Sequence, residues 1–200
     1  ANKTVSTCSG TGFTVTPSNG GGDIVPTGTT YAWSALPVVT GGLTGGATAS
    51  LQSSINGTLT NPTNTAQTAT YTVTPTSGSC TGPTFTVVAT INPRPVVPNQ
   101  TATICSGTAF TTSPTNNAPT TIIPSGTTYT WTVATNTNVT GQSDQGAGQS
   151  NISQTLTNLT NTAQTVVYTV TPTSGAAGNC VGSTFTVTVT VSPRATIANK

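Results

Sequence analysis

The sequence carries very little charge. Only 3% of its 200 residues are charged, four of them Lys or Arg and two Asp or Glu, whereas about a quarter of an ordinary globular chain is charged. Nucleic-acid binding depends on clustered basic side chains that displace phosphate counterions. Because Lys3, Arg94, Arg194 and Lys200 are spread over the whole chain, we expect no nucleic-acid partner.

Histidine is absent, which removes most catalytic and metal-binding chemistry. General acid–base catalysis needs a group that titrates near neutral pH, and a Ser or Cys nucleophile needs an activating base. The carboxylates Asp23 and Asp144 lie at non-equivalent places in glycine-rich or polar segments, so they supply no pair for hydrolysis or for calcium. We therefore predict that the chain is not an enzyme and has no catalytic, cofactor or metal site.

The chain has no long apolar run and no methionine. Its apolar runs are a few residues long, far short of the ~20 needed to cross a bilayer, and nothing at the N-terminus resembles a signal peptide. These features suggest a segment from the middle of a longer precursor, with the targeting signals elsewhere. Localisation must then be inferred from the cysteines.

Four cysteines form one widely spaced pair in each half, Cys8 with Cys80 and Cys105 with Cys180. They lack the short C-x-x-C spacing of zinc sites and redox motifs, so we predict a structural disulfide in each pair. Closing a loop of about seventy residues stabilises a fold by up to ~4 kcal/mol in the chain-entropy model. Because such bonds persist outside the cytosol, we expect a secreted, cell-surface protein.

The two halves of the sequence are copies of one another at an offset of about 97 to 100 residues. Segments starting at Cys8, Thr29, Thr58 and Tyr71 return at Cys105, Thr127, Thr155 and Tyr168. We predict two domains, residues 1–96 and 97–200. The residues at both termini match the start of a copy, so we expect the array to continue. The proline-rich stretch Asn92–Asn99 predicts a stiff connector and hence a rod of domains.

Apolar residues alternate with Thr or Ser within each copy, as in strands with one buried face. Threonine makes up roughly a quarter of the chain, which suits β-strands. We predict strands at 4–7, 13–16, 29–34, 50–59, 69–76 and 84–92, the last two forming a hairpin. With turns rich in Gly, Pro and Asn, this pattern indicates an all-β fold of two immunoglobulin-like sandwiches. The predicted core aromatics are Trp33, Trp131, Tyr71, Tyr168, Phe85 and Phe185.

The order of motifs in each copy resembles the PKD-like repeats of large Bacteroidota surface proteins. The motifs are Cys-Ser-Gly-Thr, Tyr-x-Trp, Tyr-Thr-Val-Thr-Pro-Thr-Ser-Gly, a second Cys, and Phe-Thr-Val with a closing Pro-Arg. These proteins include gliding-motility adhesins that leave by the type IX secretion system. The resemblance implies a non-catalytic stalk on the outer surface of the cell. Because Trp33 and Trp131 lack the Asp-Phe-Gly-Asp that follows Trp in typical PKD domains, no carbohydrate or calcium role is carried over.

Two other functions are compatible with the sequence. Direct binding of polysaccharide or surfaces would use the segments 41–46 and 135–148, which differ most between the copies. Alternatively, uncharged Thr-rich faces would pack laterally in an extracellular filament. An exposed patch of aromatic side chains would favour binding, and bundling at high concentration would favour the filament. For the stalk, the expected partners are adjacent repeats of the same chain, with polysaccharide bound by other parts of the parent.

Overall fold

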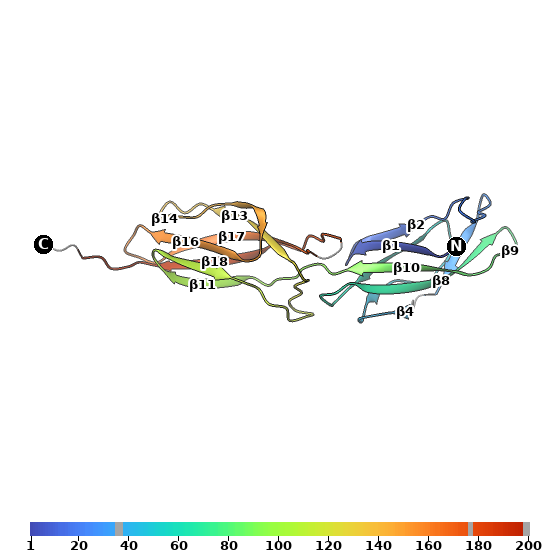
Figure 1. Ribbon diagram of the computed structural model, residues 1–200, viewed down its shortest axis with the longest axis horizontal. Coiled ribbons are helices and arrows are strands. Elements are labelled where there is room, and N and C mark those ends of the chain that lie inside the picture. Colours follow the sequence, from blue (N-terminus) through green and yellow to red (C-terminus); the bar gives the residue numbers. More distant parts are fainter. Residues whose placement is uncertain (35–37, 176–177, 198–200) are drawn as a thin grey trace. The chain divides into compact units, whose positions relative to one another are not determined.

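The computed structural model describes residues 1–34, 38–175 and 178–197, and within them the secondary structure is entirely β (Figure 1). The chain divides into unit 1, Ala1–Arg94, and unit 2, Pro95–Lys200. This boundary lies two residues before the predicted one. The reason is that Val96 pairs with Ile122 and Val97 is buried in the core of unit 2.

Unit 1 is a sandwich of two sheets. Its seven-stranded sheet has the order β1-β10-β8-β3-β6, with β4 and β9 also paired to β8, and its three-stranded sheet has the order β2-β7-β5. The strands are β1 (Lys3–Cys8), β2 (Gly12–Val15), β3 (Thr30–Trp33), β4 (Val38–Val39), β5 (Thr44–Gly45), β6 (Ala49–Gln52), β7 (Ile55–Thr60), β8 (Gln67–Ser77), β9 (Cys80–Thr81) and β10 (Phe85–Asn92).

Unit 2 repeats this plan. Its five-stranded sheet has the order β11-β18-β17-β13-β15, and its three-stranded sheet has the order β12-β16-β14. The strands are β11 (Gln100–Cys105), β12 (Thr108–Thr112), β13 (Thr128–Ala134), β14 (Val139–Thr140), β15 (Gln145–Gln149), β16 (Ile152–Asn158), β17 (Gln164–Thr173) and β18 (Phe185–Ser192). The predicted all-β fold of two immunoglobulin-like units is confirmed.

The core of each unit lies between its two sheets. In unit 1, Phe13 of β2 and Ile55 and Leu59 of β7 pack with Tyr71 and Val87 of the larger sheet, all at most 4% exposed. Alternation produces this core directly, because β10 buries Val87, Ala89 and Ile91 on one face. The predicted hairpin is present as the antiparallel pair β8–β10.

The predicted strand at 50–59 is two strands that belong to different sheets. Its first part, β6, pairs with β3, while β7 pairs with β2 after a bend at Ser53 and Ser54. Unit 2 breaks at the same place, between β15 and β16. A continuous alternation of side chains does not report which sheet a strand joins, so the sequence pattern alone does not locate this bend.

The first and last strands of each unit are neighbours and run parallel. β1 pairs with β10 from Lys3↔Val87 to Cys8↔Asn92, and β11 pairs with β18 from Gln100↔Val187 to Cys105↔Ser192. The chain therefore enters each unit at one end of the sheet and leaves from the opposite end. We call these the leading end, near Lys3 or Gln100, and the trailing end, near Asn92 or Ser192.

Candidate functional site

The predicted core aromatics lie in or against the cores. Tyr71 and Tyr168 are at most 1% exposed, and Phe185 is also buried, whereas Phe85 is partly buried against the unit 1 core. The indole N–H groups of Trp33 and Trp131 donate to the carbonyl oxygens of Ala47 and Ser143 at 3.0 and 3.1 Å. All ten aromatic residues of the chain lie within the described ranges, and none is classed as exposed.

The predicted disulfide pairing within each repeat is wrong. Cys80 and Cys105 are free and exposed, while Cys8 and Cys180 are the cysteines in disulfide linkage. Each predicted pair therefore contains one bonded cysteine and one free thiol.

Strand register explains why Cys8 and Cys80 do not meet. Cys8 lies opposite Asn92 at the trailing end of unit 1, and Cys80 lies opposite Ser77, beyond the leading end of β10. The path from Asn92 to Phe85, across to Val73 and on to Ser77 has seven plus four residue steps, roughly 36 Å at about 3.3 Å each. Disulfide Cα atoms lie within about 7 Å.

Unit 2 separates its own pair in the same way. Cys105 lies opposite Ser192 at the trailing end, whereas the carbonyl of Cys180 accepts a hydrogen bond from Ser174 at the leading end. Each repeat thus carries one cysteine at each end. The long spacing in sequence predicts a bond within each repeat, but the parallel β1–β10 and β11–β18 pairings place the two cysteines apart.

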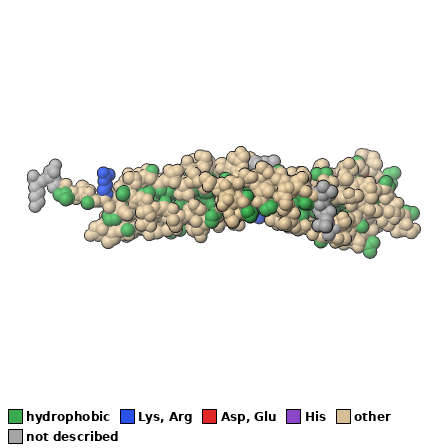
Figure 2. Space-filling model, turned by 90° about the horizontal axis from the view of Figure 1, so that it is seen from below, with side chains coloured by type: hydrophobic (Ala, Val, Ile, Leu, Met, Phe, Trp, Pro, Cys, Tyr) green, Lys and Arg blue, Asp and Glu red, His purple; other side chains and the backbone are tan. Residues whose placement is uncertain are grey.

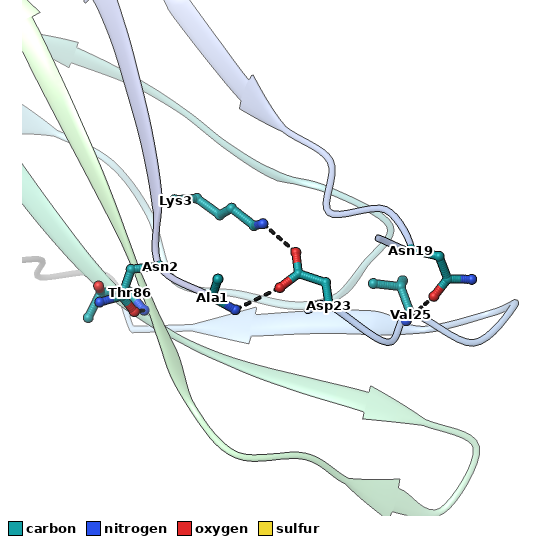
Figure 3. Close-up of polar contacts among 7 residues, drawn as sticks. All are labelled: Ala1, Asn2, Lys3, Asn19, Asp23, Val25 and Thr86. Atoms are coloured by element: carbon teal, nitrogen blue, oxygen red, sulfur yellow. Dashed lines mark hydrogen bonds and ion pairs between the residues drawn. The ribbon is translucent and has the colours of Figure 1, made fainter. Parts of the chain in front are cut away.

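The described residues hold no group of three or more His, Cys, Asp or Glu that is suited to a metal. Asp144 accepts a hydrogen bond from the backbone N–H of Val133 at 2.8 Å, and so supports β13. Asp23 forms an ion pair with Lys3 and with the amino group of Ala1, as Figure 3 shows. The hydrogen bond from Lys3, followed by that from Ala1, lowers the pKa of the Asp23 carboxyl.

A groove of about 480 Å³ opens at the leading end of unit 1. Its lining includes Ile24, Tyr31, Cys80, Gly82 and Phe85, together with the Lys3–Asp23 pair. The side chain of Ile24 is 89% exposed, which is unusual for an isoleucine. The Tyr31 hydroxyl is buried without a hydrogen-bond partner. No local sequence pattern marks this groove, because its residues come from four separate stretches.

The equivalent place in unit 2 is filled by the chain itself. Val96 forms a two-way backbone bridge with Ile122, with N···O distances of 2.9 and 2.8 Å. Ile122 is only 5% exposed and Val97 only 8%. The carbonyl of Pro95 lies so close to Gly182 that a Cβ on this glycine would sit 2.3 Å from the oxygen. The segment Pro95–Val97 therefore occupies in unit 2 what is an open groove in unit 1.

The trailing ends share a buried asparagine, which the sequence marks only as part of a repeated motif. Asn61, 2% exposed, donates to the carbonyls of Thr65 and Ile91 and accepts from the backbone and hydroxyl of Thr63. Its own N–H donates to the Ser9 hydroxyl. Asn158 makes the same set of contacts in unit 2. The repeated Thr-Asn-x-Thr-Asn-Thr in both copies was the signal for this structure.

The two segments predicted as binding loops are partly β-structure. The range 41–46 contains β5, and the range 135–148 contains β14 and most of β15. Within the described part of the chain, no helix is long and apolar enough to cross a membrane.

Comparison with known proteins gives a family match. A model described as "PKD-like domain" matches residues 5–95 and 102–195, which is most of the chain. No curated protein matches. Among solved structures, one titled "Structure of mouse clustered PcdhgC3 EC1-3" is 14% identical, with a TM-score of 0.29. The match covers 70% of this chain and 49% of that structure, so the chain spans about half its length.

Proposed function

Because the chain belongs to the PKD-like domain family, we propose that it is a structural spacer segment in a bacterial cell-surface adhesin. Domains of this family are typically extracellular and non-catalytic. In the proposed function, successive repeats hold a distal binding region away from the outer membrane. The motif resemblance to gliding-motility adhesins supports export by the type IX system and a use in gliding.

The observation that carries the proposal is the parallel pairing of the first and last strands in each unit. A chain that leaves a unit at the end opposite to its entrance adds length with every repeat. The 11-residue strand β8 alone spans about 36 Å at about 3.3 Å per residue. A unit with antiparallel terminal strands would instead return the chain to the end where it started.

The surface chemistry also supports a spacer. Figure 2 shows a face that is mostly uncharged and polar, with few hydrophobic side chains gathered together. Each of the ten aromatic residues, all in the described part of the chain, is buried or half-buried, so none is fully exposed for stacking on a sugar. A spacer needs solubility and strength rather than a recognition surface, and hydroxyl and amide side chains supply solubility without charge.

Small-angle scattering tests the proposal on the 200-residue chain and on a tandem fusion. In the fusion, residues 1–197 are followed directly by residues 1–200, so that the junction reproduces the sequence Ile197-Ala198-Asn199-Lys200. We expect the maximum dimension to double approximately from the chain to the fusion. A fusion whose maximum dimension barely exceeds that of the single chain would contradict the spacer function.

A further inference from the structure

The same surface is covered in unit 2 and open in unit 1. In unit 2, Ile122 is covered by the chain segment that precedes the repeat. In unit 1, the equivalent Ile24 lies open in the leading-end groove at 89% exposure. The groove is thus already formed in unit 1, and in unit 2 the corresponding groove is filled by the segment Pro95–Val97.

The end of the chain carries a segment equivalent to that occupant. Arg94 and Arg194 are matched by the repeat, so Pro95-Val96-Val97 corresponds to Ala195-Thr196-Ile197. Val97 is 8% exposed in the core of unit 2, whereas Ile197 is 91% exposed. One copy of the module therefore has an uncovered apolar groove at its leading end and an uncovered apolar side chain beyond its trailing end.

We propose that the leading-end groove of unit 1 binds the segment Ala195-Thr196-Ile197 of a second copy of this module. Thr196 forms the two-way backbone bridge with Ile24 that Val96 forms with Ile122, and Ile197 takes the buried place of Val97. The unpartnered Tyr31 hydroxyl in the groove lining is an independent sign that the groove is incomplete. This inference rests on the proposed spacer function, in which repeats are each other's partners.

Hydrogen exchange in the tandem fusion tests the docking. The peptide that contains Ile24 occurs twice, and only the second copy is preceded by the segment 195–197. We expect its isotope envelope to split into two equal parts, one exchanging as in the single chain and one protected. The substitution Gly82→Ala in the second copy removes the protected part, since the equivalent Cβ on Gly182 would lie 2.3 Å from the Pro95 oxygen. The matched control is Gly146→Ala, where a Cβ meets nothing within 4 Å.

Two outcomes would overturn the docking. A single fast envelope would show that the segment does not occupy the groove. Protection of both copies by added extracellular polysaccharide, with none from the fusion itself, would assign the groove to a sugar. Because scattering measures extension and exchange measures the groove, an extended fusion with an unprotected Ile24 would overturn the docking and leave the spacer function standing.

Discussion

At the scale of single residues, the clearest contrast between the repeats is a buried tyrosine. The Tyr168 hydroxyl forms a 2.9 Å hydrogen bond with the side-chain oxygen of Gln154. In unit 1 the residue equivalent to Gln154 is Gly57, and the Tyr71 hydroxyl is buried without a partner. The same aromatic core position is therefore satisfied in one repeat and unsatisfied in the other.

This contrast predicts opposite effects of one substitution. We expect Tyr168→Phe to lower the free energy of unfolding of unit 2 by about 1 kcal/mol, a typical net value for a hydrogen bond. Tyr71→Phe should leave unit 1 unchanged or slightly more stable, because it removes an unsatisfied hydroxyl. Native-state hydrogen exchange of the β10 and β18 amides measures each unit separately. Equal destabilisation by both substitutions would refute this account.

The buried asparagine predicts a larger loss. Asn61→Ala removes two donated and two accepted side-chain hydrogen bonds and leaves the Thr65 and Ile91 carbonyls without these donors. We expect unit 1 to lose about 2–4 kcal/mol of unfolding free energy, seen as a lower urea midpoint. Asn61→Asp should also destabilise, because a carboxylate cannot donate to either carbonyl. Asn56→Ala, at an exposed position of β7, is the neutral control.

The types of the residues predicted which side chains are buried better than they predicted which cysteines pair. Trp33, Tyr71 and Val87 are large apolar or aromatic side chains on alternating strands, and their burial follows from composition and period. The partners of Cys8 and Cys80 depend on which strands are neighbours and in which direction they run. A parallel pairing between the first and last strands is a long-range property that no local pattern expresses.

At the scale of elements, the segment before β11 is part of the fold of unit 2 rather than a separate connector. We expect Gly182→Ala to destabilise unit 2, because the new Cβ would lie 2.3 Å from the Pro95 oxygen and 2.9 Å from Pro172 Cγ. Loss of exchange protection at the Ile122 amide would report displacement of Val96. Gly82→Ala in unit 1 meets only Pro75 Cγ, at 3.1 Å, among close contacts, so it should cost much less. If the two substitutions lowered the free energy of unfolding of their units by comparable amounts, the close contact between Pro95 and Gly182 would be contradicted.

The elements themselves were largely predictable. The hairpin β8–β10 follows from alternation on both sides of a Gly-containing turn. The division of 50–59 between two sheets was not predictable, because it depends on Leu51, with a φ of 56°, and on a register irregularity between Tyr31 and Trp33. The groove was missed for a similar reason, since it exists only where β3, β9 and the 22–26 segment come together.

At the scale of the whole molecule, the lack of titratable groups predicts a wide plateau of stability against pH. Histidine is absent, so no histidine titrates between about pH 5 and 8. On the acid side, the lowered pKa of Asp23 means that its ion pair stabilises unit 1 at pH values above 3.8, the ordinary pKa of an aspartate. That contribution is lost as the pH falls through the lower pKa of the folded state.

The alkaline limit is set by tyrosines. Burial raises the pKa of Tyr31, Tyr71, Tyr129 and Tyr168 above the ordinary 10.0. A raised pKa gives stability that is complete below 10.0 and is lost as the pH rises toward the pKa of the folded state, because only the unfolded chain ionises there. We therefore expect urea midpoints to stay constant from about pH 5 to 9 and to fall above 10. Replacing Tyr71 with Phe should weaken the alkaline fall in unit 1 and leave that of unit 2 unchanged. A midpoint that changes markedly near pH 6.5 would require a titrating group that this composition does not contain.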